Sequence, residues 1–193
     1  MIFTKNCMKR NFELKDYIQD SDIHKDRIFH LKEFIKGKKK VIDVGCGAFM
    51  PQLLGIKYAC DKYNAKPFLD KLDWKGEFKK ANVYKLPYKD KEFDLAICSE
   101  VIEHLNSKRK VTKAIRELNR IAKEWIITTP CAYDTDPNHK FHFGYGKDNL
   151  FEVIPEEFKF NEDYIVIRKG YYYYISNNIP KMLKIFKVKN GNK

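Results

Sequence analysis

A short apolar segment followed by a glycine-rich turn is the first place in this sequence where chemistry could occur. Residues 40–44, Lys-Val-Ile-Asp-Val, have the composition of a buried strand, and Gly45 and Gly47 end it sharply. Glycine lets the backbone come close to a ligand, because no Cβ blocks the approach. Asp61 ends the next apolar run, where a carboxylate can accept hydrogen bonds from both hydroxyls of a ribose. The pattern predicts a nucleoside cofactor, and NAD is one candidate.

Two later segments argue against NAD. Residues 82–87 are Asn-Val-Tyr-Lys-Leu-Pro, and residues 93–105 are Phe-Asp-Leu-Ala-Ile-Cys-Ser-Glu-Val-Ile-Glu-His-Leu. Together with residues 41–47 they resemble, in order and spacing, the class I S-adenosylmethionine-dependent methyltransferases, and within them the type-11 group. The resemblance covers residues 40–130. It implies an α/β fold with one Rossmann-like, doubly wound sheet of seven strands, mostly parallel, with an antiparallel last strand.

The same resemblance implies how S-adenosylmethionine is held as the cofactor. Asp61 would bind the ribose hydroxyls, Asn82 would bond the adenine amino group, and Val83 would pack beside the adenine ring. Asn82 accepts that bond through its side-chain oxygen, but it lacks the charge of the aspartate that is more usual there. Phe49 stands where many relatives have a third glycine. The cofactor-binding residues expected in full are Asp43, Gly45, Gly47, Asp61, Asn82, Val83 and Ser99.

Histidines and carboxylates after residue 98 are candidates for catalysis or for a metal site. A histidine titrates near neutral pH, so His104, His139 and His142 are the candidate general bases. Two carboxylates and two imidazoles could instead hold a divalent cation, as in the small-RNA 3′-terminal 2′-O-methyltransferases, which this pattern resembles. The same Glu-Val-Ile-Glu-His-Leu sequence also occurs in type-11 enzymes without a metal, so no metal is expected. The alternative metal site consists of Glu100, Glu103, His104 and His139.

Alternating strand and helix patterns must position these groups. Apolar residues at helical spacing predict a leading helix over residues 22–35, and Ser107 can cap a helix that runs to Lys123. Strand followed by helix followed by strand implies a parallel sheet with helices on both faces. The apolar runs that predict strands are residues 40–44, 58–60, 77–81, 93–98 and 125–129.

The C-terminal part has a different pattern. Residues 131–150 form a long aperiodic stretch, which we expect to cover the substrate because it follows a strand that ends at the cofactor crevice. Residues 164–175 indicate a β-hairpin that turns at Gly170, and residues 180–188 a short basic amphipathic helix. We therefore expect one domain over residues 1–193. Its parts are a leading helical segment (1–39), a cofactor-binding core (40–130) and the substrate-covering loop, hairpin and last helix (131–193).

Composition limits the class of protein and its partners. The 193 residues are 44% apolar and 33% charged, which suits one globular domain. The net charge of +12 comes mostly from lysine, which favours a solvated surface over arginine-mediated nucleic-acid binding, although nucleic acid stays an alternative partner. Five scattered cysteines predict reduced thiols rather than disulfides or a zinc site. With no apolar run long enough for a membrane span and no signal-peptide pattern, a cytoplasmic location is expected.

The sequence therefore predicts an enzyme that transfers a methyl group from S-adenosylmethionine to an oxygen, nitrogen or carbon nucleophile of a small molecule or macromolecule. Its methyl acceptor and oligomeric state do not follow from the sequence. One alternative is a metal-dependent RNA 3′-terminal 2′-O-methyltransferase. The other is a non-catalytic paralogue that binds S-adenosylmethionine, which Phe49, Asn82 and a short first helix suggest.

Overall fold

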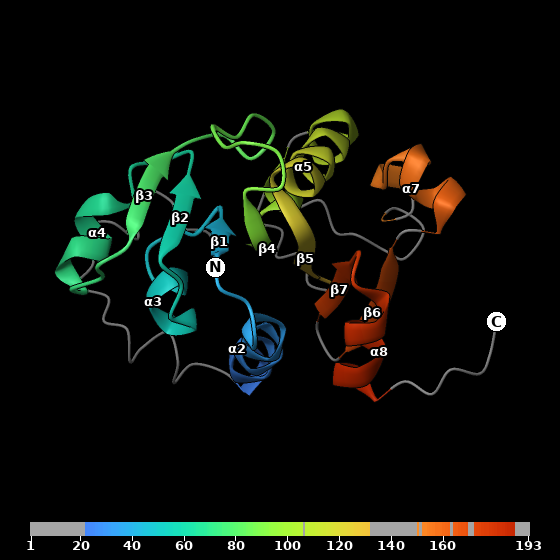
Figure 1. Ribbon diagram of the computed structural model, residues 1–193, viewed down its shortest axis with the longest axis horizontal. Coiled ribbons are helices and arrows are strands. Elements are labelled where there is room, and N and C mark those ends of the chain that lie inside the picture. The colour runs from blue at the N-terminus through green and yellow to red at the C-terminus, as the bar shows by residue number, and fades with distance from the viewer. Residues whose placement is uncertain are drawn as a thin grey trace, which may run out of the picture.

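One twisted sheet forms the centre of the structure (Figure 1). The computed structural model describes residues 22–105, 107–131, 150, 152–162, 164–169 and 172–187. Within these ranges the sheet has seven strands in the order β3-β2-β1-β4-β5-β7-β6. The strands are β1 (Val41–Val44), β2 (Tyr58–Asp61), β3 (Glu77–Lys80), β4 (Phe93–Ser99), β5 (Ala122–Pro130), β6 (Ile165–Lys169) and β7 (Tyr172–Ser176).

The directions of the strands confirm the expected fold class. The first five strands are parallel, with β1 between β2 and β4 at the centre of the sheet. The hairpin adds the last two strands, and β7 runs antiparallel to both β5 and β6. Because β1 is followed along the chain by β2 on one side and β4 lies on its other side, the strand order reverses at β1. Such a reversal opens a crevice at the carboxyl ends of the strands.

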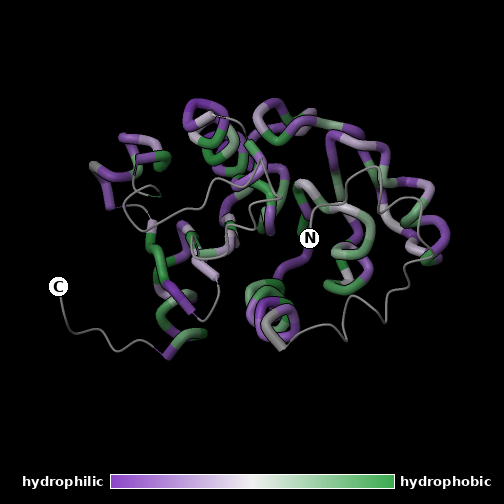
Figure 2. The backbone as a smooth tube through the Cα atoms, turned by 180° about the vertical axis from the view of Figure 1, so that it is seen from behind, coloured by the Kyte–Doolittle hydropathy of each residue, from purple (hydrophilic) through white to green (hydrophobic). Residues whose placement is uncertain are grey.

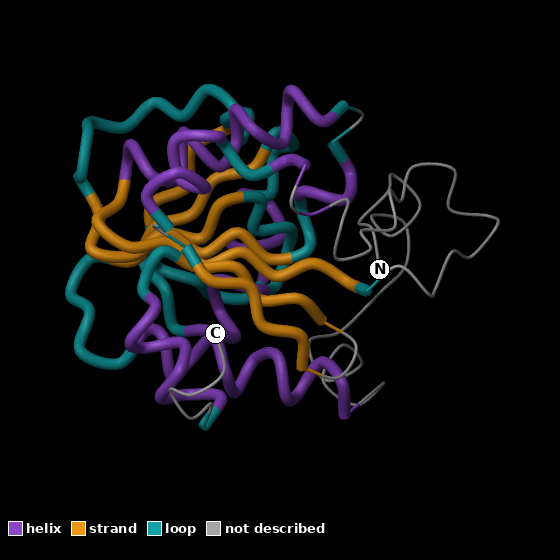
Figure 3. Tube along the Cα trace, turned by 90° about the vertical axis from the view of Figure 1, so that its right-hand side faces the viewer, coloured by secondary structure: helices purple, strands orange, loops and turns teal. Residues whose placement is uncertain are grey.

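Helices cover both faces of the sheet (Figure 3). On one face α5 and α7 pack over the core that includes Ile42 and Val44, and on the other face α2, α3 and α8 pack over Val41 and Leu95. The short α4 packs beside β2 through Leu69. The helices are α2 (Asp22–Ile35), α3 (Met50–Leu54), α4 (Lys66–Lys71), α5 (Lys108–Ile121), α7 (Glu156–Asn161), α8 (Ile179–Phe186) and the 3₁₀ turn η2 (Ile102–His104).

The helix α5 shows why the local sequence predicts its own structure. Ser107 accepts a hydrogen bond from the backbone N–H of Lys110, so it caps the helix as expected. The buried positions recur at helical spacing, which agrees with the alternation of hydrophobic and hydrophilic residues along the helices in Figure 2. The helix ends at Ile121 rather than Lys123, because Ala122 already pairs with Phe93 as the first residue of β5. The buried residues of α5 are Val111, Ala114, Ile115, Leu118 and Ile121.

Three further expectations concern the cysteines, membrane-spanning helices and the substrate-covering stretch. The cysteines at 46, 60, 98 and 131 are buried free thiols, as predicted, and Cys7 lies outside the described residues. In the described part of the chain, none of the helices combines the length and apolarity that crossing a membrane would require. The expected substrate-covering stretch falls almost wholly outside the described residues.

The leading helix α2 packs against the C-terminal hairpin rather than standing apart from the core. Phe34 is fully buried in the cluster that also contains Tyr172 and Tyr174 of β7. His30 Nδ1 lies 3.2 Å from the Tyr174 hydroxyl, and the aromatic ring of Phe29, 60% exposed, points outward on the same helix. Helix α2 is therefore part of the folded domain.

The central strand β1 carries a carboxyl group into the core. Asp43 is 1% exposed, and its Oδ2 has no hydrogen-bond partner. The pKa of Asp43 is raised to about 8, because burial and the negative charge of Asp61 raise it more than the positive charge of Arg27 lowers it. A carboxyl group in such a place takes up a proton far more readily than in water.

We expect substitutions in α2 to separate the buried from the exposed face. Phe34→Ala should lower the free energy of unfolding by about 3–5 kcal/mol, because it removes a fully buried ring and leaves a cavity. Phe29→Ala on the same helix is the matched control and should change it by less than about 0.5 kcal/mol. Urea denaturation measures both. Equal small effects would show that α2 does not belong to the cooperative fold.

The buried Asp43 predicts a pH dependence of stability. Between about pH 4 and pH 8 the unfolded chain loses the Asp43 proton while the folded chain keeps it, so this group makes folding less favourable as pH rises. Asp43→Asn removes that penalty. The stability of the variant relative to the natural protein should therefore increase from pH 4 to pH 8 in denaturation experiments. A difference that stays constant over this range would contradict the raised pKa.

Candidate functional site

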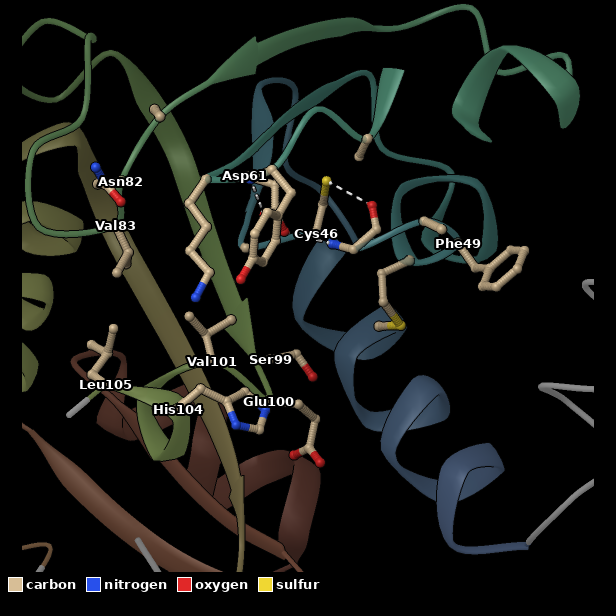
Figure 4. Close-up of a pocket in the computed structure, with 18 of the residues that line it drawn as sticks. Cys46, Phe49, Asp61, Asn82, Val83, Ser99, Glu100, Val101, His104 and Leu105 are labelled. Atoms are coloured by element: carbon tan, nitrogen blue, oxygen red, sulfur yellow. Dashed lines mark hydrogen bonds between the residues drawn. The ribbon is translucent and has the colours of Figure 1, made fainter. Parts of the chain in front are cut away.

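A pocket of about 390 Å³ opens at the carboxyl ends of β1, β2 and β4. Six of the seven expected cofactor-binding residues line it, whereas Asp43 lies in β1 below the glycine loop and does not. Figure 4 shows Asn82 and Val83 on one side of the pocket and Ser99, Glu100 and His104 gathered on another. The six lining residues are Gly45, Gly47, Asp61, Asn82, Val83 and Ser99.

The glycine loop is tied to the neighbouring strand. The backbone N–H groups of Gly45 and Cys46 both donate to the Cys60 carbonyl, at 2.8 and 3.1 Å. Gly45 has φ of 76° and Gly47 of 56°, in the left-handed region that favours glycine. A Cβ on Gly45 would lie 2.4 Å from Cγ2 of Val101, so this position also needs glycine for space. The loop therefore lies in contact with the segment after β4.

Asp61 holds the base of the loop and faces the pocket. Its Oδ2 accepts a hydrogen bond from the Gly47 N–H at 3.0 Å, and its Oδ1 accepts one from the Tyr63 N–H at 2.9 Å. Burial raises the pKa of Asp61, and these backbone bonds act in the opposite direction. Each carboxylate oxygen has a second lone pair, so the group can accept two further hydrogen bonds from a ligand.

The segment after β3 forms the wall nearest the Asp61 side. Asn82 is exposed and its carbonyl accepts a hydrogen bond from the Lys85 N–H at 2.9 Å, while Val83 is buried. The exposed amide side chain of Asn82 can therefore contact a ligand while its backbone stays in a tight turn. Phe49 occupies the position where many type-11 proteins have a third glycine. It precedes the short α3, and its ring points away from the pocket centre in Figure 4.

The segment after β4 brings a serine and a carboxylate to the opposite wall. Ser99 Oγ lies 2.7 Å from Thr128 Oγ1 on β5, which orients the hydroxyl. Glu100 has φ of 59°, a conformation that non-glycine residues rarely adopt, and it often marks functional sites. Burial raises the pKa of Glu100, and the charge of Arg27 lowers it.

Arg27 is a charged pocket residue that the sequence did not predict. It lies on α2 with its side chain 1% exposed, and its Nη1 is 3.1 Å from Glu100 Oε1. Its Cζ lies 4.9 Å from the centre of the Tyr172 ring, a cation–π contact. Arg27 stands four residues before the buried Leu31, on the apolar face of the helix. A charged residue on the apolar face of a predicted helix is the sequence signal that could have indicated a functional role for Arg27.

The structure describes some of the candidate general bases and metal ligands, and the others lie outside the described residues. His104 lines the pocket from η2, with Nε2 4.0 Å from Oε1 of the buried Glu103. Thr129 donates to Glu103 at 3.4 Å, and burial raises the pKa of Glu103 well above its usual range. His139 and His142 lie outside the described residues. Over the described ranges, no group of three or more histidines, cysteines or carboxylates is placed to hold a metal ion.

Parts of the chain are similar to known proteins. Residues 42–125 match the type-11 family described as a methyltransferase domain. An uncharacterized protein of Methanocaldococcus jannaschii is 37% identical over 102 residues, which cover 48% of this chain and 40% of that protein. The chain thus matches less than half the length of this curated relative.

Solved structures show the same fold. A protein of Pyrococcus horikoshii has a TM-score of 0.63 at 17% identity, covering 81% of this chain and 92% of that chain. The magnesium protoporphyrin IX methyltransferase of Synechocystis, solved with bound S-adenosylmethionine, has a TM-score of 0.57 at 14% identity, covering 79% of this chain and 78% of that chain. Residues 42–125 are thus similar to the type-11 methyltransferase domain, and the chain shares its Rossmann-like fold with these solved structures.

Proposed function

We propose that this protein transfers a methyl group from S-adenosylmethionine to an oxygen, nitrogen or carbon nucleophile of an acceptor. The observation that carries the proposal is the position of Asp61. Its carboxylate lines the pocket at the end of β2 while bonding the Gly47 N–H, so it couples the glycine loop to the place where a ribose would lie. The methyltransferase family match over residues 42–125 supports the same function.

The pocket residues suit the chemistry of the cofactor. Its volume of about 390 Å³ lies within the range of ~300–1,000 Å³ that is usual for small-molecule sites. Asp61 offers acceptors for two hydroxyls, Asn82 offers an amide for the adenine edge, and Val83 offers an apolar surface for the ring. Gly45 and Gly47 leave the backbone open to close approach.

The chain's own contribution to catalysis is to position two reactants. When bound, S-adenosylmethionine supplies an electrophilic methyl group on a positively charged sulfonium. The walls formed by Ser99 and Glu100 limit how an acceptor can approach, and such alignment alone accounts for much of the acceleration in two-substrate reactions. His104, on the same wall, is the described residue that we assign to accept a proton from the acceptor nucleophile.

Asp61 provides a direct test of cofactor binding. Asp61→Ala should weaken S-adenosylmethionine binding by about 1.5–3 kcal/mol, the range for losing hydrogen bonds to a charged group. Asp61→Asn, which keeps one acceptor oxygen, should lose less. Calorimetric titration measures the affinities, and thermal unfolding checks that each variant is folded. Exposed Asp70 on α4 is the control, since Asp70→Ala should bind normally. Unchanged affinity in a folded Asp61→Ala variant would remove this residue from the site.

Cofactor choice and turnover form a second test. Wild-type protein should bind S-adenosylmethionine and show negligible binding of NAD, because the proposed site provides for a nucleoside linked to methionine. With methyl-labelled cofactor and a panel of metabolites and RNAs, label should reach an acceptor and the rate should be insensitive to a chelator.

The other outcomes of this assay are equally specific. Comparable NAD affinity would restore NAD as the candidate cofactor. Binding of the cofactor without any labelled product across the panel would favour a non-catalytic protein. Chelator-sensitive labelling of an RNA 3′ end, lost in His139→Ala with cofactor binding retained, would replace the proposal by the metal-dependent alternative.

A further inference from the structure

Arg27 places a buried positive charge at one end of the pocket. The side chain is 1% exposed, lines the pocket, and reaches it from α2, a helix outside the segment that matches the methyltransferase family. Glu100 lies 3.1 Å from its Nη1, and the Tyr172 ring lies 4.9 Å from its Cζ. A guanidinium held by a carboxylate and an aromatic face has a defined plane and direction.

The order of the strands decides which part of the cofactor would meet this charge. Asn82 follows β3, Asp61 ends β2, Gly45 follows β1, and Glu100 follows β4. These strands are consecutive neighbours in the sheet, so their ends span three inter-strand distances, about 14 Å. With adenine at Asn82 and ribose at Asp61, the methionine part must extend over the glycine loop toward the end that holds Glu100 and Arg27.

Two lysines also line the pocket in the described part of the chain. Lys62 directly follows Asp61, at the ribose position. Lys110 Nζ lies 5.7 Å from the ring centre of Tyr84, in the segment that follows Asn82. Of these three cations in the described lining, Arg27 forms an ion pair with Glu100, directly after β4. A methionine carboxylate at that end needs a positive partner, because a buried charge is costly unless it is paired.

We propose that Arg27 binds the α-carboxylate of the methionine part of S-adenosylmethionine, an inference that rests on the proposed function. The guanidinium has five N–H donors and can face two carboxylates at once, so Glu100 can keep its contact while another edge meets the ligand. The leading helix α2 then supplies a cofactor-binding group from outside the family-matched core. Tyr172 and Glu100 act as positioning residues for it.

The test compares two cofactors that differ only in the carboxylate. Decarboxylated S-adenosylmethionine keeps the nucleoside, the sulfonium and the amine. Wild-type protein should bind S-adenosylmethionine about 10- to 100-fold more tightly than the decarboxylated form, as expected for a charge-assisted contact. In Arg27→Gln this preference should fall to near one, through loss of affinity for S-adenosylmethionine alone. Arg27→Lys keeps the charge without the planar fork, and should give an intermediate preference.

Because the readout is a ratio within each variant, changes in stability do not imitate it. Lys62→Gln is the matched control and should keep the wild-type preference. Equal affinity of wild-type protein for both ligands would overturn the proposal even if the Arg27 variants failed to fold. A uniform loss of affinity for both ligands in Arg27→Gln would also overturn it, since that is the mark of a structural role. Failure of wild-type protein to bind either ligand would instead refute the proposed function, and this inference with it.

Discussion

The geometry of the pocket depends on how the chain leaves β1. Two backbone N–H groups, of Gly45 and Cys46, share the Cys60 carbonyl, so the turn is attached to the end of β2. Val101 approaches so closely from the other side that no side chain fits at Gly45. The ends of three adjacent strands are thereby held against each other by one loop. The pocket between these strand ends is lined by the glycine loop after β1, by Asp61 at the end of β2 and by Ser99 at the end of β4.

The second constraint is electrostatic. Asp43, Glu100 and Glu103 are carboxyl groups withdrawn from water, and burial is the largest cause of the raised pKa of each. The positive charge of Arg27 lowers the pKa of all three. Burying charges in this way weakens a fold unless they are compensated, and such clusters are commonly retained where a site uses them. The cost of burying these carboxyl groups agrees with the proposed role of the region in binding a charged cofactor.

Contacts of α2 attach the leading helix to the sheet. This helix, expected as the first part of a single domain, is packed on β7 through His30 and Tyr174 and lines the pocket through Arg27. The C-terminal hairpin in turn supports that helix with Tyr172. Helix α2, before the family-matched segment, and strand β7, after it, therefore meet beside the pocket, and residues 40–130 alone would lack Arg27.

The sequence by itself determined the features that short-range chemistry controls. Buried parallel strands are continuous apolar runs, the turn after β1 needs glycine, Ser107 caps α5, and Asp61 ends β2. Most of the expected cofactor site follows from these, because consecutive strand ends meet at one edge of the sheet. Tertiary structure alone decided that Asp43 lies beneath the loop and that Arg27 enters the pocket. Asp43 is buried because β2 and β4 flank β1 in the sheet. The position of Arg27 depends on packing between α2 and a hairpin about 140 residues away, which no local pattern encodes, since the energy of such contacts arises only once distant segments exclude water together.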